Sequence, residues 1–412
     1  TMSNNIVGII AEYNPLHNGH VFQLEEAARR AEASGIVVVL SSHFTQRGEP
    51  SFIDKWQRTA LALQAGADIV LELPVFFSCH NAGVFAAGAV DILAACHTVT
   101  HLSFGMENHC SDLSAILDIL IHEPDPFKRQ LRRYLDKGYS YVKARAMAMD
   151  EMIPLSGSIL SLPNNSLALA YLLHSRKKGY PFQPLPIERK GADFHDEKSC
   201  GKWASASAIR KAYSDGRISD VHMALPLYSR LVLERTLEEG RIVFSAQNLW
   251  PFLQTSLLRS SQEEISRTAE MKEGLENLFL KLAATSSSWK EFISKGTSKR
   301  YTMGTLQRLA IHYLLGISHW ENRAWQRLGP QYIRVLGFSQ KGQKMLRDMR
   351  KRSTLPIITR GHMPPSQGIG SRLLQLEHFP SILWEHLVPS PLFNQEIKAK
   401  PLQTESSFLD LN

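Results

Sequence analysis

Two histidines, His17 and His20, flank an Asn-Gly pair in the stretch "AEYNPLHNGH", which covers residues 11–20. The stretch follows an apolar run and precedes a helical pattern, which predicts a turn between a strand and a helix. A helix start offers unpaired N–H groups to phosphates, and imidazoles there can donate to phosphate oxygens. The pattern is typical of attack on the α-phosphate of ATP without a covalent enzyme intermediate. The alternative is a helix cap beside a surface histidine.

A second group suited to phosphates lies near residue 205. In "SASAIR", Ser205 and Ser207 stand at a predicted helix start, and Arg210 follows one turn inside the helix. Hydroxyls, helix N–H groups and a guanidinium there could bind the β- and γ-phosphates. An ordinary helix cap remains the other interpretation of this segment.

These side chains need a scaffold, and the first third of the chain alternates strand and helix patterns. Short, branched apolar runs are typical of buried parallel strands. Four strand-helix units in about 105 residues resemble a doubly wound nucleotide-binding sheet, which binds ligands at the carboxyl ends of its strands. The predicted strands cover residues 5–11, 36–42, 68–74, 99–105 and 181–189. Helical patterns cover 20–34, 54–67, 81–96, 110 to about 150, 165–178 and a segment from about 205.

The pattern becomes mainly helical beyond residue 215, which predicts two domains in the 412-residue chain. We expect an α/β, Rossmann-like domain with a parallel sheet in residues 1–215. A basic, mainly α-helical C-terminal domain is expected in residues 216–412. Residues 1–200 hold 18 basic and 21 acidic side chains, whereas residues 201–412 hold 29 and 18. The basic half suits nucleic-acid phosphates, with a solvated helical face as an equal alternative.

The composition favours a cytoplasmic protein. Four cysteines, none in a C-x-x-C arrangement, suggest a reducing compartment. No apolar run approaches the roughly 18 residues of a membrane span. We expect no membrane association, and no obligate protein partner is evident. We also expect no protein-bound metal, because adjacent pairs such as Cys79 with His80 rarely reach one ion, and "FHD" at 194–196 favours a cap or surface role.

Longer blocks resemble a known family. These are "AEYNPLHNGH", "FTQRGEPSFIDKWQRTALALQAGADIVLELP", "FAAGAVDIL", "LSFGMEN", "LPNNSLALAYL", "IERKGADFHD", "SASAIR", "SKRYTMGTLQRLAIHYLLGI" and "YIRVLGFSQKGQKML". Together they are similar to the bacterial tRNA(Met) cytidine acetate ligase family, which is part of the nucleotidylyltransferase superfamily with an H-x-G-H motif.

The resemblance implies an ATP-dependent ligase. It implies a nucleotidylyltransferase-like, ATP-binding catalytic domain in residues 1–215 and a tRNA-binding domain in residues 216–412. The implied enzyme uses ATP, accompanied by Mg²⁺, to convert acetate into acetyl-adenylate and pyrophosphate. It then passes the acetyl group to N4 of the wobble cytidine of elongator tRNA(Met), which forms N4-acetylcytidine and AMP.

Residue roles follow from the same resemblance. Arg58 is expected to assist Lys55 in neutralising phosphate charge, with an exposed helix face as the alternative for both. Gly105 is expected where the adenine or ribose rests, because a side chain there would intrude. The expected catalytic residues are His17, His20, Lys55 and Arg210. The expected ATP-binding residues are Ile10, Ala11, Glu12, Tyr13, Asn14, Pro15, Leu16, His17, Asn18, Gly19, His20, Gly105, Asn164, Asn165, Arg189, Lys190, Ser205 and Ser207.

Two further expectations concern the substrates. The residues expected to bind tRNA are Lys341, Lys344, Arg347, Arg350, Lys351 and Arg352. The sequence departs from the family at "LSSHF", where Ser42 and His43 replace the usual glycine and asparagine. If that loop forms part of the acetate pocket, these two residues could change which acyl group the enzyme prefers.

Two other functions stay open. A small-molecule adenylyltransferase for nucleotide cofactor synthesis would share the front-half motifs but has no use for the basic back half. A non-catalytic tRNA-binding protein is the second, although the intact His17, Gly19, His20 and Arg210 speak against it. Binding to tRNA tests the first alternative, and pyrophosphate release with acetate and ATP tests the second.

Overall fold

A mostly parallel β-sheet forms the centre of the protein in the computed structural model, which describes residues 5–107, 113–190, 201–298, 300–361 and 368–404. Within these residues the sheet has eight strands in the order β5-β4-β1-β2-β3-β6-β7, and β8 also pairs with β6. Strands β1 to β5 are parallel, while β6 is antiparallel to β3. The strands are β1 (Ile6–Ala11), β2 (Gly35–Ser41), β3 (Ile69–Leu73), β4 (His101–Met106), β5 (Gln183–Glu188), β6 (Ile333–Ser339), β7 (Ile357–Ile358) and β8 (Leu402–Thr404).

Helices cover both faces of this sheet, which explains the uninterrupted apolar sequence of β2. Side chains alternate between the faces of a strand. Val37 and Val39 accordingly join a core that includes residues of α4 and α9, whereas Val38 and Leu40 join one that includes residues of α1, α2, α10 and α11. The α/β fold class predicted from the sequence is confirmed.

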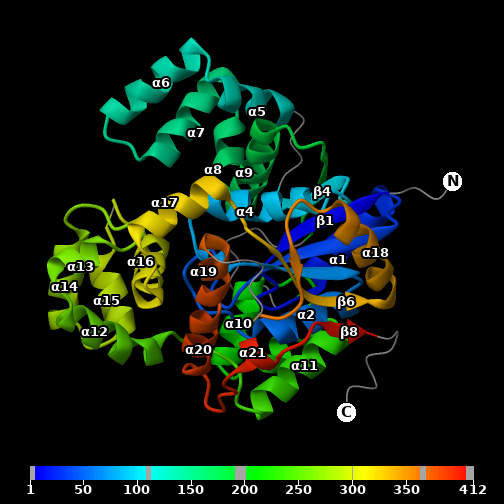
Figure 1. Ribbon diagram of the computed structural model, residues 1–412. Coiled ribbons are helices and arrows are strands. Elements are labelled where there is room, and N and C mark those ends of the chain that lie inside the picture. Colours follow the sequence, from blue (N-terminus) through cyan, green and yellow to red (C-terminus); the bar gives the residue numbers. More distant parts are fainter. Residues whose placement is uncertain (1–4, 108–112, 191–200, 299, 362–367, 405–412) are drawn as a thin grey trace.

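The helices of the first half are α1 (Asn18–Arg30), α2 (Lys55–Gln64), α3 (Val75–Ser78), α4 (Ala82–Ala95), α5 (Leu113–His122), α6 (Asp125–Asp136), α7 (Tyr141–Met152), α8 (Ser156–Ser161), α9 (Pro163–Lys178) and α10 (Ala206–Ser214). We call α6 and α7, with the turn between them, the arm. Figure 1 shows the arm projecting from the domain that contains the sheet.

The helices of the second half are α11 (Leu227–Glu238), α12 (Trp250–Arg259), α13 (Gln262–Ser266), α14 (Leu275–Thr285), α15 (Trp289–Gly296), α16 (Met303–Leu315), α17 (His319–Leu328), α18 (Gln340–Arg352), α19 (Ile369–Leu376), α20 (His378–Glu385) and α21 (Gln395–Lys398). Two 3₁₀ segments, Ile218–Ala224 and Gln247–Leu249, accompany them. No helix in the described part of the chain is both long and apolar enough to span a membrane.

The division expected at residue 215 does not match the path of the chain through the sheet. Helix α11 still belongs to the sheet domain, where the Ser229 hydroxyl donates to the Leu16 carbonyl at 2.7 Å. Helices α12 to α16 then form a lobe beside that domain (Figure 1). The chain returns at residue 333, because β6 pairs with β3 and brings β7 and β8 into the same sheet. The second half is therefore mainly helical but completes the first domain.

Candidate active site

A cavity of about 450 Å³ opens at the carboxyl ends of β1 and β4. This is where parallel α/β sheets place ligands. The cavity is lined by part of the predicted set, namely Ile10, Ala11, Glu12, Tyr13, Asn14, His17, His20, Gly105, Asn164, Arg189, Ser205, Ser207 and Arg210. The fold thus brings together segments that lie almost 200 residues apart in the sequence.

His17 and His20 hold each other at the start of α1. His17 is the residue that caps the helix, and its Nδ1 accepts a hydrogen bond from the Gly19 N–H at 3.0 Å. The Nδ1 of His20 accepts from the His17 N–H at 3.3 Å. The two rings stack with their centroids 3.8 Å apart. The capping and phosphate interpretations of this motif are therefore compatible, because each ring uses only one nitrogen for the cap.

Burial keeps both imidazoles neutral, and their hydrogen bonds decide which ring nitrogen carries the proton. Burial, with Arg189 as a smaller contributor, lowers the pKa of His17 to about 3. Burial and the neighbouring His17 hold the pKa of His20 well below its ordinary value. Both imidazoles are therefore neutral at pH 7. Since each Nδ1 is an acceptor, the proton resides on Nε2, which makes each ring a neutral donor.

Helix α10 supplies a second anion-binding end. Ser205 caps this helix and its Oγ accepts from the Ala208 N–H at 3.2 Å. The Ser205 and Ser207 hydroxyl oxygens lie 3.0 Å apart. Arg210, one turn inside, donates to the Asn14 carbonyl at 2.7 Å and so ties α10 to the loop before α1. Two helix N-termini, each with polar side chains, therefore line one cavity.

A polar chain at the end of β4 lines another part of the cavity. Arg189 donates to the Asn164 Oδ1 at 3.2 Å, and the Asn164 amide donates to the Glu107 Oε1 at 2.6 Å. Gly105 lies next to Arg189, since a Cβ added to Gly105 would be 3.4 Å from the Cγ of Arg189. A Cβ at that distance makes ordinary van der Waals contact, so a side chain at Gly105 would pack against Arg189 in the cavity wall.

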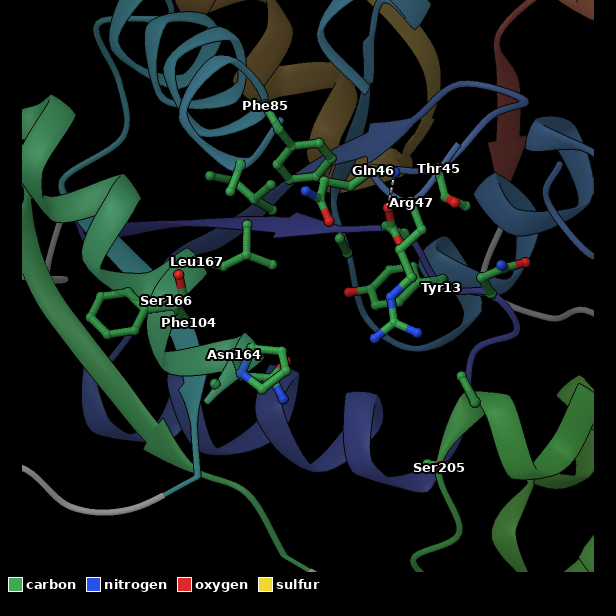
Figure 2. A pocket seen from close by; sticks show the side chains of 18 of the residues that line it. Tyr13, Thr45, Gln46, Arg47, Phe85, Phe104, Asn164, Ser166, Leu167 and Ser205 are labelled. Atoms are coloured by element: carbon green, nitrogen blue, oxygen red, sulfur yellow. Dashed lines mark hydrogen bonds between the residues drawn. The ribbon is translucent and has the colours of Figure 1, made fainter. Parts of the chain in front are cut away.

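The loop between β2 and α2 lines the cavity with residues that the sequence analysis missed: Thr45, Gln46, Arg47 and Glu49. The Gln46 N–H donates to the Glu12 Oε1 at 2.8 Å. Figure 2 shows Arg47 projecting into the cavity on the side of Tyr13, with Leu167 on the other side. In the described part of the chain, no hydrogen bond or ion pair engages the Arg47 guanidinium, which leaves it free for a ligand. The block "FTQRGEP" already contained this signal, because a basic residue beside glycine follows a predicted strand there.

Several predicted ATP-binding residues support the cavity without lining it. Asn18 donates to the carbonyls of Lys202 and Met223, and Pro15 and Leu16 are buried. Asn165 is fully buried and accepts from the Glu107 N–H at 2.9 Å. Gly19 and Lys190 line a smaller adjoining hollow of about 30 Å³.

The expectation that Lys55 and Arg58 neutralise phosphate charge is not met, because both side chains are fully buried. The Lys55 Nζ contacts Glu72 and lies 2.7 Å from a carboxylate oxygen of Glu396. Arg58 donates to the carbonyls of Glu12, Ser41 and Ser42. Lys55 therefore stabilises the packing of the C-terminal segment onto the sheet, and Arg58 holds the ends of β1 and β2 together.

Ser42 and His43 likewise do not line the cavity. The Ser42 hydroxyl donates to Glu377 at 2.6 Å, and the His43 ring lies 5.7 Å from the ring of Trp384. Both are buried against the C-terminal helices. The departure from the family that the resemblance implies at these two positions would therefore affect the packing of α20 and its preceding residue, and not directly the surface of the cavity.

The residues expected to bind tRNA lie on α18, far from the cavity. Asp68, just before β3, accepts from the Ser339 hydroxyl at 2.9 Å and lies 3.0 Å from the Lys341 Nζ. Helix α18 therefore begins at the amino ends of the parallel strands, whereas the cavity lies at their carboxyl ends. Figure 1 shows α18 on the side of the sheet away from the arm and α16. The fold does not bring this basic cluster to the site.

Within the described residues, one group of three carboxylates has the spacing of a metal site: Glu72, Glu377 and Glu396. Its charge is already countered by Lys55 and by Arg334, which bonds to Glu72 at 3.0 Å and also to Glu396. Burial and the neighbouring Glu72 raise the pKa of Glu377 to about 8. This group is therefore a buried ion-pair network. The "FHD" segment at 194–196 lies outside the described residues.

The sequence matches a known family over almost its whole length. A model described as HIGH Nucleotidyl Transferase matches residues 4–396. A tRNA(Met) cytidine acetate ligase from Caldanaerobacter subterraneus is 38% identical over 380 residues, which cover 90% of this chain and 93% of that protein. A protein of the same name from Halothermothrix orenii is 33% identical and covers 94% of this chain and 96% of its own length.

Solved structures give the same result. The crystal structure of Thermotoga maritima TmcAL without ligand has a TM-score of 0.89 and 31% sequence identity, and covers 97% of this chain and 99% of that one. A second form of the same protein, bound to alpha-thio ATP, has the same TM-score and identity and covers 97% and 100%.

Proposed function

The chain belongs to the HIGH nucleotidyl transferase family and, within it, to the tRNA(Met) cytidine acetate ligases, and on that premise we propose that it is an ATP-dependent tRNA(Met) cytidine acetate ligase. It activates acetate with ATP and acetylates N4 of the wobble cytidine of elongator tRNA(Met). The observation that carries this proposal is the pair of neutral histidines in the same cavity as a second helix N-terminus.

The first step is attack of an acetate oxygen on the α-phosphorus of ATP. The bond between the α-phosphorus and the bridging oxygen breaks, so that pyrophosphate leaves and acetyl-adenylate forms. The Nε2–H groups of His17 and His20 are suited to donate to the phosphate oxygens on which charge develops. The start of α10, with Ser205, Ser207 and Arg210, is suited to the outer phosphates. Neutral imidazoles suit this role because they bind the anion without exchanging a proton.

The second step joins the acetyl group to the tRNA. The cytidine N4 attacks the acetyl carbonyl carbon, the bond from that carbon to the AMP oxygen breaks, and N4 loses a proton to solvent. The cytosine amine is a weak nucleophile, so the main contribution expected of the protein is to position it against the acyl phosphate.

Magnesium is expected to enter with ATP. Two carboxylates line the cavity, Glu12 and Glu49, and they carry the oxygen ligands that Mg²⁺ prefers. Burial raises the pKa of Glu12, while the Gln46 N–H and the arginines nearby act in the opposite direction. The Glu49 carboxylate lies 3.7 Å from the Arg210 guanidinium, and an ion held by Glu12 or Glu49 would take its remaining ligands from phosphates and water. When bound, the ion supplies positive charge to the triphosphate as pyrophosphate leaves.

Acetate-dependent exchange of labelled pyrophosphate into ATP tests the first step, and mass spectrometry of tRNA(Met) after incubation with ATP and acetate tests the whole reaction. Replacing His20 with alanine should abolish the exchange while leaving tRNA binding largely intact. His319→Ala is the matched control, because His319 is exposed on α17 outside the cavity.

Three results would contradict the proposal. Exchange that proceeds without acetate would favour a different adenylyltransferase. Absence of exchange in the unmodified protein would favour a protein that binds tRNA without catalysis. Loss of tRNA binding alone in His20→Ala would remove His20 from the chemical step.

A further inference from the structure

We infer that the arm, α6 and α7, is the surface that holds the RNA backbone beside the cavity. This inference rests on the proposed function for the identity of the RNA. The arm takes the role that the sequence analysis expected of α18. The inference follows from the charge of the arm, its exposed aromatic rings and its position.

The arm concentrates positive charge without neutralising it. The arm, residues 125–152, holds seven basic and four acidic side chains, whereas residues 1–200 as a whole have more acidic than basic side chains. All seven basic side chains lie between residues 128 and 145, where Asp136 is the single acidic one. Lys128, Arg129, Arg132, Arg133 and Lys137 are all exposed. No carboxylate in the described ranges forms an ion pair with any of the seven cations. Unpaired, exposed cations are what a phosphate backbone requires, because binding then releases counterions without first breaking an ion pair.

The pattern of α6 explains why these cations point outward. Phe127 and Tyr134, which lie seven residues apart and hence on one face of the helix, are buried. The Tyr134 hydroxyl donates to Glu151 in α7 at 2.8 Å, which joins the two helices of the arm. Lys128, Arg129 and Arg132 lie away from this buried face and are exposed, so their charges are available to a ligand.

Exposed aromatic rings accompany the cations at the start of α7. The exposed fractions of Tyr139 and Tyr141 are 36% and 53%. The Lys143 Nζ lies 4.9 Å from the centre of the Tyr139 ring, and the Arg145 guanidinium lies 5.9 Å from the centre of the Tyr141 ring. Rings among cations suit the unstacked bases of an RNA loop, which stack on aromatic side chains while the cations bind phosphates.

The position of the arm links this surface to the chemistry. Val142, beside Tyr141, is 58% exposed and also lines the 450 Å³ cavity. An RNA loop on the arm would therefore lie at the mouth of the cavity, where one base can turn inward. A strand on α18 would lie at the opposite ends of the parallel strands.

A matched pair of triple variants tests the inference. The arm variant carries Lys128→Gln, Arg129→Gln and Arg132→Gln. All three side chains are exposed and none forms a hydrogen bond or ion pair through its side chain within the described residues, so the substitutions should not affect folding. An unchanged unfolding midpoint and unchanged acetate-dependent pyrophosphate exchange would verify this in the full-length protein.

The control variant removes the same charge from the far surface by Lys344→Gln, Arg347→Gln and Lys351→Gln. These side chains on α18 are also exposed. Binding of unmodified tRNA(Met) to both variants is measured by fluorescence anisotropy at several salt concentrations. A short anticodon stem-loop is measured in parallel, because it should reach the arm while bound at the cavity.

The arm variant should bind tRNA(Met) more weakly, on the order of tenfold, and its salt slope should fall by about 2, since each phosphate contact contributes about 0.7 to 0.9. The control variant should lose much less affinity for tRNA(Met). The anticodon stem-loop should likewise bind the arm variant more weakly than the control variant. An equal or greater loss of affinity for tRNA(Met) in the control variant would overturn the inference. So would tighter binding of the unmodified full-length protein to anionic lipid vesicles than to tRNA(Met), if the arm variant lost that binding. Failure of pyrophosphate exchange in the unmodified protein would instead contradict the proposed function, and the binding comparison would still test the arm.

Discussion

Replacing His17 with asparagine should separate its structural role from its chemical one. The His17 Nδ1 caps α1 by accepting from the Gly19 N–H. Asparagine is among the preferred capping residues, and its side-chain oxygen can accept the same hydrogen bond. His17→Asn therefore keeps the cap but removes both the titrating ring and its Nε2–H donor.

The structure sets the size of the effect on stability. Burial lowers the pKa of His17 to about 3 in the folded protein, whereas the unfolded chain binds the proton with a pKa of about 6.5. Between these values the unfolded state holds the proton and the folded state does not, so His17 reduces stability as the pH falls from about 6.5 toward about 3. At pH 5 the reduction is about 2 kcal/mol, from about 1.5 pH units at about 1.36 kcal/mol each.

Urea unfolding at pH 8 and at pH 5 measures this effect. The unmodified protein should lose about 2 kcal/mol more between the two pH values than His17→Asn does. The other titrating groups are common to both proteins, so their contributions largely cancel in this difference. His319→Asn should behave like the unmodified protein, because His319 is exposed. An equal loss of stability in His17→Asn and the unmodified protein would refute the assignment of a neutral, buried His17.

The same variant tests the chemical role. Loss of one donor to a developing phosphate charge typically lowers the rate by about 10² to 10³. Pyrophosphate exchange by His17→Asn should therefore fall by that order at pH 8, where the stability of the variant is nearly that of the unmodified protein. Exchange at the unmodified rate would show that His17 only caps the helix.

Three further predictions follow from the site and its surroundings. Arg47→Gln should lower kcat/KM for ATP in the exchange assay on the order of tenfold with no change in the unfolding midpoint, because the guanidinium is exposed and unpaired among the described residues. Arg334→Met should reduce the free energy of unfolding in urea by about 3 to 5 kcal/mol, because it leaves Glu72 and Glu396 with a single cation. Exposed ion pairs contribute about 0 to 1 kcal/mol, so a loss of less than about 1 kcal/mol would contradict the buried network. Ser42→Gly should leave the rate ratio of acetate to propionate unchanged, because its hydroxyl faces Glu377 and not the cavity; a shifted ratio would place that loop at the acyl group.

Local patterns in the sequence predicted the elements of the catalytic half well. The strands expected at 36–42 and 68–74 are found at Gly35–Ser41 and Ile69–Leu73, and the helix expected at 81–96 is Ala82–Ala95. These predictions were accurate because the burial of a parallel strand on both faces leaves an apolar run that can be recognised without knowing its neighbours. The strand Ile333–Ser339 was not predicted, because this short apolar run lies between two helices, α17 and α18, in the mainly helical part of the chain.

Roles that depend on distant contacts were less predictable. Lys55 and the cluster on α18 are basic residues in sequence blocks of the expected kind, yet one is buried against Glu72 and the other lies at the amino ends of the strands. Nothing within ten residues of Lys55 indicates that Glu396 will pair with it. Arg47 was not predicted although a basic residue beside glycine follows a strand there, because a loop has no periodicity that tells which way its side chains point.

The sequence by itself determined the five parallel strands β1 to β5, the helix that His17 caps and the identity of the groups suited to a phosphate chain. These are local properties, set by side-chain periodicity and by capping within a few residues. Only the tertiary structure decided which cations remain available to a ligand, because burial and pairing depend on segments that meet after folding. Lys55 is enclosed by the returning C-terminal segment, while Arg47 and the cations of the arm remain exposed around the cavity.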